Sequence, residues 1–394
     1  MKLAKRINIA PSLTMAMSTK AKEMRAQGID VISFAAGEPD FFTPQHIKDA
    51  GIKAINENKT YYTPVSGIIE LKEKVSQKLK KENGLSYNTD EITINSGAKH
   101  SVFNVLAVLV EEGDEVILIS PYWVSYSEMV RILGGKITVL PTTEETGFKI
   151  SPADLNKVIS RRTNVLLLNS PNNPTGAVYS REELFALAEY LEDKNIIIIS
   201  DEIYEKIVYD DNTHISIASY SEKVKEKTVV INGVSKAFSM TGWRIGYAAG
   251  PKDIIGAVNK LQGHTSGNPS SISQWATLAA LEKDNSFLND WLAEFKKRKD
   301  YIVRELNGMD DISCRDPEGA FYVFPNVSRL FGKTLHEYPI NNSVDLANYL
   351  LEYGKIAVVP GRAFGAENYI RFSFATSMEN ITRGIKRFKD SVTV

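Results

Sequence analysis

The sequence predicts an α/β fold in which a mostly parallel β-sheet is wrapped by helices and followed by a smaller α+β lobe. Three observations predict it. Six short runs between residues 115 and 250 are apolar at nearly every position, which is typical of strands covered on both faces. Helical patterns lie between these runs, and such alternation is typical of an α/β domain. After about residue 306, short strand-like runs separated by helical stretches indicate the smaller lobe.

The elements follow this order along the chain. The segment before about residue 45 is rich in turn signals, among them Pro39 and Pro44, and is expected to pack onto the smaller lobe. The strands predicted for the large sheet are EVILIS (115–120), KITVLP (136–141), NVLLLNS (164–170), NIIIIS (195–200), TVVING (228–233) and RIGYAAG (244–250).

Helices are predicted between and after these strands. Residues 180–194 place four apolar side chains at helical spacing behind Ser180, a predicted N-cap: Leu184, Leu187, Ala188 and Leu191. Residues 273–306 form one long helical pattern. The smaller lobe then contains the strand-like runs GAFYVFP (319–325), IAVVPG (356–361) and YIRFSFA (369–375).

Polar side chains follow directly after three of the predicted strands. NVLLL runs into NSPNNPTG, NIIII into SDEIY, and TVVI into NGVSK. Ligands of open α/β sheets bind at the carboxyl ends of the strands. The sequence therefore predicts four side chains on one rim: Asn173, Asp201, Tyr204 and Lys236.

Lys236 and Asp201 indicate the chemistry of this rim. Taken alone, a loop lysine is most often a solvated charge, and an aspartate after a strand often caps the next helix. A lysine desolvated beside other cations loses its proton and attacks carbonyl groups, which forms a Schiff base. A carboxylate near the floor of an apolar sheet needs a partner, and a protonated ring nitrogen would serve. At an effective dielectric of about 20, such a pair ~4 Å apart attracts by roughly 4 kcal/mol.

A phosphate-binding turn is predicted in NSGAKHSVFNVLAVLV, residues 95–110. The small-residue turn opens a helix whose free N–H groups and dipole favour an anion, although small residues also begin ordinary helices. Ser235 and Arg244 offer a hydroxyl and a guanidinium for the same anion, and a surface ion pair is the alternative for Arg244.

Two further side chains have a functional and a structural interpretation. Trp123, just beyond the strand 115–120, is either part of the core or a flat stacking surface at the rim. In YIRFSFA, strand alternation separates Arg371 from the apolar face. Arg371 is therefore either a carboxylate-binding residue of the smaller lobe or a member of an edge-strand salt bridge.

The composition excludes several classes of protein. Among 394 residues, 47 Lys and Arg balance 48 Asp and Glu, so no basic footprint for nucleic acid or an anionic membrane is present. The single cysteine, Cys314, rules out an intramolecular disulfide, and the five histidines lack ligand-like spacing, so no metal site is expected. No stretch approaches the 18 or so apolar residues of a membrane span, and we expect a cytoplasmic protein.

These motifs together resemble the class I aminotransferases, which are pyridoxal 5′-phosphate enzymes, and most closely their bacterial aspartate aminotransferase branch. The resemblance implies a PLP-dependent transferase of fold type I, with a seven-stranded sheet in a large cofactor-binding domain. It also implies the division into residues 45–290 for that domain and 1–44 with 291–394 for the small domain. The matching motifs run nearly end to end in order and spacing: AAGEPDF (35–41), YYTPVSG (61–67), SGAK, SPYWVSY (120–126), NSPNNPTGAVY (169–179), SDEIYE (200–205), VSKAFSMTGWRIGY (234–247), VVPG and RFSFA.

The resemblance also implies a role for each candidate residue. Lys236 is joined to the cofactor aldehyde and then moves the proton at the substrate Cα, while Asp201 pairs with the ring nitrogen. Asn173 and Tyr204 hold the ring oxygen, and Trp123 stacks on the ring. The phosphate is held by Gly97, Ala98, Lys99, Ser235 and Arg244, and by Tyr62 of a neighbouring subunit, so a homodimer is expected.

For the substrate, the resemblance implies that Arg371, Asn173 and the Gly37 backbone bind the α-carboxylate. Lys99, assisted by Thr14, would meet a distal carboxylate, in which case Lys99 serves the phosphate only through its backbone N–H. The implied reaction moves an amino group from an L-amino acid, aspartate first, to a 2-oxo acid, 2-oxoglutarate, in two half-reactions.

Two departures from the family pattern concern the phosphate and the side-chain specificity. Gly233 stands where many aminotransferases have a serine or threonine, three residues before the lysine, so Arg244 is expected to hold more of the phosphate. No motif matches the arginine that animal and enteric aspartate enzymes use for the side-chain carboxylate.

Other functions remain open at this stage. An aromatic-preferring or broad-range aminotransferase and a β-lyase use the same scaffold. A regulatory module that keeps the cofactor domain without turnover would usually carry a basic DNA-binding region, which this chain lacks. A doubly wound protein that binds another phosphate ligand would show no imine absorbance.

Overall fold

A seven-stranded sheet forms the centre of the larger part of the molecule, in the order β2-β8-β7-β6-β5-β3-β4. The computed structural model describes residues 3–283 and 285–393, and it confirms the predicted α/β fold. β8 is antiparallel to both of its neighbours, and the other pairs are parallel. The strands are β2 Ile92–Asn95, β3 Glu115–Ser120, β4 Lys136–Pro141, β5 Thr163–Asn169, β6 Ile197–Asp201, β7 Thr228–Gly233 and β8 Gly246–Ala249.

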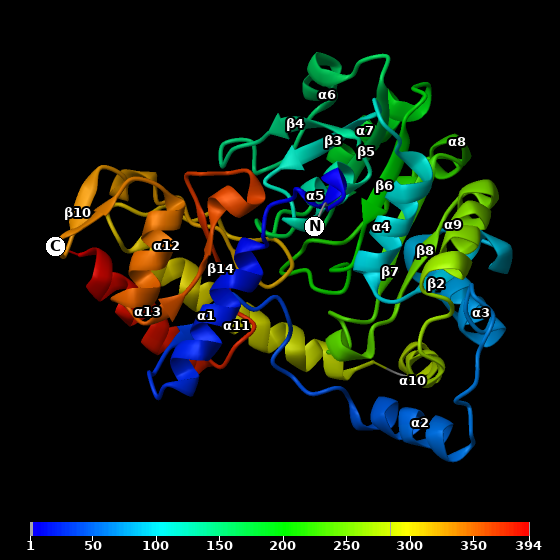
Figure 1. Cartoon of the computed structure of the whole chain (residues 1–394), viewed down its shortest axis with the longest axis horizontal. Coiled ribbons are helices and arrows are strands. Elements are labelled where there is room, and N and C mark those ends of the chain that lie inside the picture. Colours follow the sequence, from blue (N-terminus) through cyan, green and yellow to red (C-terminus); the bar gives the residue numbers. More distant parts are fainter. Residues whose placement is uncertain (1–2, 284, 394) are drawn as a thin grey trace.

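Thirteen α-helices in the described residues connect or cover the strands (Figure 1). They are α1 Leu13–Ala26, α2 Gln45–Asn56, α3 Ile69–Lys78, α4 Ala98–Leu109, α5 Ser125–Ile132, α6 Pro152–Val158, α7 Arg181–Glu192, α8 Glu222–Lys225, α9 Lys252–Thr265, α10 Ser271–Glu282, α11 Phe287–Asn307, α12 Ser343–Glu352 and α13 Met378–Val392.

Both faces of the central strands of the large sheet are buried, which explains their uninterrupted apolar runs. Val116 and Leu118 of β3 belong to one core with α4, α5 and α9, whereas Ile117 and Ile119 belong to a second core with α6, α7 and α8. Alternate side chains of one strand therefore serve opposite faces. Four of the predicted strands agree with the structure to within one residue at each end; β6 and β8 start two residues later than predicted, and β2 was not predicted.

The predicted helix at residues 180–194 is confirmed as α7. Ser180 caps it, because its Oγ accepts a hydrogen bond from Glu183 N at 3.2 Å, and the Glu183 carboxylate accepts from Ser180 N at 2.8 Å. This reciprocal pair is a capping box. The four apolar side chains predicted for the inner face are all buried.

The single long helix predicted for residues 273–306 is wrong, because the structure divides this stretch into α10 and α11. The interruption falls at a polar sequence, and the Asn285 side chain donates to the carbonyl of Ala280 in the last turn of α10. Residue 284 of that stretch lies outside the described residues. Apolar periodicity continues across the break and so concealed it.

The smaller lobe is built from short strands that include one near the N-terminus. β1 pairs in parallel with β12, and β14 is the central strand of a three-stranded sheet with β13 and β9. Figure 1 shows α1 lying beside the C-terminal elements and α11 extending from the large sheet toward them. The strands are β1 Ile32–Ser33, β9 Tyr322–Val323, β10 Lys333–Leu335, β11 Tyr338–Ile340, β12 Ile356–Ala357, β13 Val359–Pro360 and β14 Ile370–Ser373.

None of the described helices is long and apolar enough to cross a membrane.

Candidate active site

A cavity of about 320 Å³ lies where the carboxyl ends of the parallel strands meet the smaller lobe. We call it the cleft. Most of the residues predicted from the sequence line it: Thr14, Gly37, Ala98, Lys99, Trp123, Asn173, Asp201, Tyr204, Ser235, Lys236, Arg244 and Arg371.

Strand direction explains why these residues converge. Asp201 ends β6, and the loops after β5 and β7 contain Asn173 and Lys236. Arg244 precedes its strand, yet it reaches the same rim because β8 runs antiparallel and presents its amino end there. Arg371 enters from β14 of the smaller lobe.

Lys236 is half-buried in the cleft, and burial lowers the pKa of its amine from 10.5 to about 8. The nearby cations Arg371 and Arg244 lower this pKa further, whereas Glu38 and Asp201 oppose them. The amine donates a hydrogen bond of 2.5 Å to the Gly37 carbonyl. With a pKa of about 8, roughly a tenth of the Lys236 amine is neutral and nucleophilic at pH 7.

Asp201 is a buried carboxylate that has one strong side-chain donor. The hydroxyl of Tyr126, on α5, donates to Asp201 Oδ2 at 2.6 Å, and the backbone N–H of Ile203 donates to Oδ1 at 3.2 Å. Burial raises the pKa of Asp201 to about 6, while the Tyr126 hydrogen bond acts to lower it. The arrangement leaves a carboxylate at the cleft floor that favours a cationic partner.

Arg371 connects the smaller lobe to the rim. Its Nη1 donates to Asn173 Oδ1 and its Nη2 to the Ala35 carbonyl, both at 2.9 Å. Its Nε is buried and has no hydrogen-bond partner among the described residues. A guanidinium held in this way offers a directed donor to an incoming carboxylate.

The predicted phosphate turn forms an anion cradle at the start of α4. Gly97 takes φ +91°, and a side chain at this position would collide with the Arg244 guanidinium. Arg244 donates to the carbonyls of Ser96 (3.1 Å) and Thr241 (2.9 Å). His100 accepts a 3.2 Å hydrogen bond from Ser96 N through Nδ1. Helix N–H groups and a guanidinium thus face the same space.

Lys99, Trp123 and Thr14 all line the cleft. The Lys99 ammonium is 4.8 Å from the centroid of the Trp123 ring. Burial, and then the charge of Arg244, lower the pKa of Lys99. The Thr14 hydroxyl is buried without a hydrogen-bond partner in the part of the chain that the structure describes. These groups are available to a second anionic group of a ligand.

Two predicted residues do not line the cleft. Gly97 lies behind Ala98 and shapes the cradle through its conformation and its contact with Arg244. Tyr62 is 98% exposed and does not line the cleft of its own chain. Its implied role in a neighbouring subunit stays a prediction.

The sequence interpretation missed five residues that line the cleft: Tyr126, Asn169, Ile203, Thr241 and Tyr322. Tyr126 is three residues after Trp123, and this helical spacing was a usable signal. The Tyr322 hydroxyl lies 2.8 Å from that of Tyr204. No sequence pattern brings Tyr322 to Tyr204, because 118 positions separate them.

One cluster of possible metal ligands lies next to Asp201: Glu202, Glu205 and His214, with one ligand atom of each within 4.8 Å of the others. Histidine spacing did not reveal it. Glu205 pairs with Lys78, and Glu202 accepts hydrogen bonds from Ser200 (2.8 Å) and Ser216 (2.6 Å). Since protein donors already engage both carboxylates, we interpret the cluster as a buried ion-pair network. The expectation of no metal site stays a prediction.

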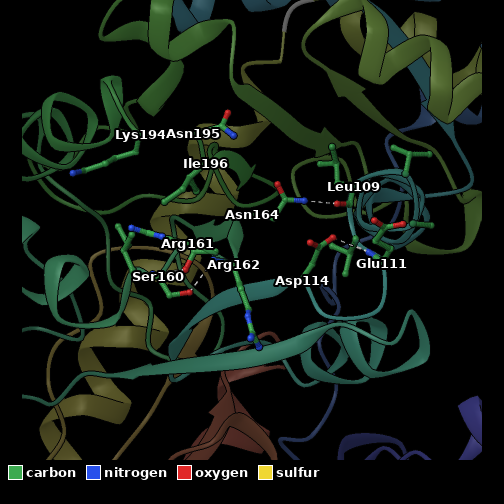
Figure 2. Close-up of a pocket in the computed structure, with 15 residues that line it drawn as sticks. Leu109, Glu111, Asp114, Ser160, Arg161, Arg162, Asn164, Lys194, Asn195 and Ile196 are labelled. Atoms are coloured by element: carbon green, nitrogen blue, oxygen red, sulfur yellow. Dashed lines mark hydrogen bonds between the residues drawn. The ribbon is translucent and has the colours of Figure 1, made fainter.

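A second, more open hollow of about 660 Å³ lies at the opposite end of the sheet, near the amino ends of β3 and β5 (Figure 2). Its lining mixes the cations Arg161, Arg162 and Lys194 with the acids Glu111 and Asp114. None of the sequence-predicted site residues lines it. The cleft therefore remains the candidate active site.

The chemistry of the cleft fits a particular kind of ligand. The cradle suits a phosphate, the Asp201 carboxylate suits a protonated ring nitrogen, and the Lys236 amine suits an aldehyde. Arg371 remains available for the carboxylate of a second molecule.

Comparisons with known proteins agree with this chemistry. The aminotransferase class I and II family matches residues 29–388. Aspartate aminotransferase of Bacillus subtilis is 45% identical over 99% of this chain and 98% of its own length, and a probable aspartate/prephenate aminotransferase of Aquifex aeolicus is 44% identical over 99% and 98%. Among solved structures, the Rhizobium meliloti aspartate aminotransferase superposes with a TM-score of 0.96 (40% identity; 100% and 99% covered). The Thermus thermophilus enzyme with maleate has a TM-score of 0.94 (40% identity; 99% and 100% covered).

Proposed function

The chain belongs to the class I and II aminotransferases, and on this basis we propose that it moves the amino group of L-aspartate to 2-oxoglutarate with pyridoxal 5′-phosphate as cofactor. One observation carries the cofactor proposal. The Lys236 amine, with its pKa lowered to about 8, shares a cleft with the buried Asp201 carboxylate and with the anion cradle at Arg244.

The residues of the cleft fit this cofactor. Gly97 leaves space that a side chain would fill, and Arg244 occupies that space. Ser235 and the first N–H groups of α4 complete a set of phosphate donors. When bound, the cofactor supplies an aldehyde that captures amines and a ring that withdraws electrons.

The side chains of the chain then perform distinct tasks. Lys236 Nζ is the attachment point and, once released, the base that moves a proton at the substrate Cα. Asp201 holds the proton on the ring nitrogen, and Tyr126 keeps that carboxylate in place through its 2.6 Å hydrogen bond. Asn173 and Tyr204 would hold the ring oxygen, and Trp123 would stack on the ring.

On the substrate side, Arg371 binds the α-carboxylate together with Asn173 and the Gly37 backbone. Lys99 and Thr14 receive the side-chain carboxylate of aspartate, since one is a cation that lines the cleft and the other a hydroxyl without a partner among the described residues. This is the basis on which we propose aspartate rather than an apolar amino acid.

Substitution of Lys99 tests the substrate assignment. Lys99→Ala should raise the KM for aspartate by about tenfold to a hundredfold, because a charged hydrogen bond contributes roughly 1.5–3 kcal/mol. The KM for phenylalanine should change little. Equal effects on both substrates would assign Lys99 to the phosphate instead.

Three other activities are distinguishable by product analysis. A broad-range or aromatic-preferring enzyme would turn over tyrosine and phenylalanine as fast as aspartate. A β-lyase would release pyruvate and ammonia from a β-substituted amino acid without a 2-oxo acid. Relatives named aspartate/prephenate aminotransferase make prephenate the first alternative acceptor to assay.

We also propose the division into a large domain, residues 45–290, and a small domain, residues 1–44 with 291–394. The pairing of β1 with β12 supports the assignment of the N-terminal segment to the small domain. A homodimer is proposed because large apolar side chains are exposed at the surface: Tyr62 is 98% exposed, Tyr61 80% and Phe42 88%.

Borohydride reduction tests the central proposal. Reduction of cofactor-saturated protein, followed by peptide mass mapping, should place the stable adduct on Lys236. An adduct on another lysine, or none, would contradict it. The half-reaction with each of the twenty amino acids, monitored through the absorbance spectrum of the cofactor, would then rank the amino donors.

A further inference from the structure

Tyr322 joins two parts of the cleft that have separate tasks. It is fully buried in β9, where it pairs with Ser373, two positions from Arg371 on β14. Its hydroxyl lies 2.8 Å from the Tyr204 hydroxyl, and the guanidinium carbon of Arg371 lies 4.4 Å from the centroid of its ring. Tyr322 therefore contacts both Tyr204 and Arg371.

The hydroxyl pair has a preferred direction. Among the described residues, neither hydroxyl has another hydrogen-bond partner, so one of the two hydrogens joins the oxygens and the other is left over. The charge of Arg371 lowers the pKa of both hydroxyls, but the guanidinium lies against the ring of Tyr322, at 4.4 Å, and so acts more strongly on the Tyr322 O–H. The more acidic hydroxyl is the better donor, so Tyr322 donates to Tyr204 and leaves the Tyr204 hydrogen free for the cleft.

The ring of Tyr322 has a second effect, on Arg371. Cation–π attraction at 4.4 Å holds the guanidinium plane while its two terminal nitrogens bond Asn173 and Ala35. This leaves Arg371 Nε without a partner among the described residues. Gly37 packs closely against the Tyr322 hydroxyl, because a Cβ at Gly37 would lie 2.9 Å from that oxygen.

We propose that Tyr322 is a positioning residue that aims the Tyr204 hydroxyl at the cofactor ring oxygen through its own hydroxyl, and holds the substrate-binding Arg371 through its ring. The inference rests on the proposed function, and it assigns the two effects to different atoms of one side chain. The two effects are therefore separable by substitution.

The hydroxyl is tested with Tyr322→Phe. Without the Tyr322 hydrogen bond, Tyr204 is a weaker donor to the ring oxygen, and the lysine-linked nitrogen keeps its proton to higher pH. The midpoint of the spectrophotometric pH titration of the cofactor-loaded protein should rise by about 0.5 unit, the equivalent of one modest hydrogen bond. Because the aromatic ring remains, the Kd for maleate, a dicarboxylate probe, should stay within about twofold.

The ring is tested with Tyr322→Leu and Tyr322→Met, either of which removes the cation–π contact. The Kd for maleate should rise by about tenfold in a folded variant, in addition to the shift of the titration midpoint. Far-UV circular dichroism identifies the variants that fold, and Tyr322→Phe decides the hydroxyl effect whatever the outcome for the other two.

Tyr87→Phe is the matched control. Tyr87 is 5% exposed and its hydroxyl has no hydrogen-bond partner among the described residues, so its loss should change neither the midpoint nor the Kd. The inference would be overturned if the titration midpoint of Tyr322→Phe equalled that of the wild type. It would also be overturned if a folded Tyr322→Leu or Tyr322→Met variant bound maleate with an unchanged Kd. Borohydride mapping in each protein separates this result from a failure of the proposed function, which would leave no adduct on Lys236 in the wild type.

Discussion

At the scale of single residues, the reactivity of the cleft depends on the protonation of one amine. Burial and neighbouring cations lower the pKa of Lys236 to about 8, so its neutral fraction rises as the pH passes through that value. Only the neutral amine attacks an aldehyde. In the apoprotein, Lys236 is therefore activated by its surroundings before any ligand arrives.

The pH dependence of cofactor uptake tests this pKa. The rate of covalent uptake by the apoprotein should rise from pH 6 and level off above about pH 8. An amine with the ordinary pKa of 10.5 would continue to gain rate up to pH 10. Stopped-flow absorbance measures the rate of uptake at each pH, with a model alkylamine as the reference. If the rates for the protein and the alkylamine depended on pH in the same way, the lowered pKa would be contradicted.

Asp201 provides the second prediction at this scale. Asp201→Ala should still bind the cofactor but slow Cα deprotonation by about three powers of ten, because the carboxylate–ring pair contributes roughly 4 kcal/mol. Single-turnover kinetics with Cα-deuterated aspartate isolates this step. A loss smaller than tenfold would argue against pairing with the ring nitrogen.

At the scale of secondary-structure elements, the turn before α4 combines a backbone constraint with a binding function. Gly97 has a left-handed φ of +91°, which ordinary residues rarely adopt, and the Arg244 guanidinium occupies the space of a missing side chain. One glycine thus allows the helix N-terminus and the arginine to face the same anion.

Gly97→Ala should therefore have two consequences. The strained backbone should lower the free energy of unfolding by about 1–2 kcal/mol. Displacement of Arg244 should weaken cofactor binding by about tenfold or more, since charged hydrogen bonds contribute roughly 1.5–3 kcal/mol. Denaturant titration and equilibrium dialysis measure the two effects.

Gly28→Ala is the control for this prediction. Gly28 also has a positive φ, +82°, but a Cβ there meets no atom within 4 Å. It should show the stability loss while keeping cofactor affinity. Equal affinity loss in both variants would mean that Arg244 is not displaced.

At the scale of the whole molecule, the exposed surface around Tyr62 concerns assembly. Tyr62 is 98% exposed and does not line the active-site cleft of its own chain, although the family resemblance implies a contact with phosphate. Light scattering should give twice the mass of the chain. Tyr62→Phe should raise the Kd of the cofactor about fivefold to tenfold, as expected for one hydrogen bond to phosphate, while Tyr61→Phe should not.

Mixed subunits distinguish a contact across the dimer from one within a chain. If Tyr62 acts on the neighbouring subunit, a dimer of Lys236→Ala with Tyr62→Phe has one damaged site that contains both changes and one intact site. That intact site should bind the cofactor with the wild-type Kd. A Kd raised at the active site as in Tyr62→Phe, or a monomer in solution, would contradict the proposed assembly.

Much of the fold followed from local patterns. Continuous apolar runs indicated strands buried on both faces, and two cores on opposite sides of the sheet account for that pattern. The division between α10 and α11 could not be predicted in this way, because the apolar periodicity continues across the short polar segment that separates the two helices.

Within the cleft, the sequence determined which residues follow the strand ends, and therefore the convergence of Asn173, Asp201 and Lys236 on one rim. Chain connectivity and the rule for parallel sheets are sufficient for that, because both act locally along the chain. The hydroxyl of Tyr126 on Asp201 and the pair Tyr204–Tyr322 were decided only by the tertiary structure. These contacts join residues 75 and 118 positions apart, and they depend on how separate elements pack in three dimensions.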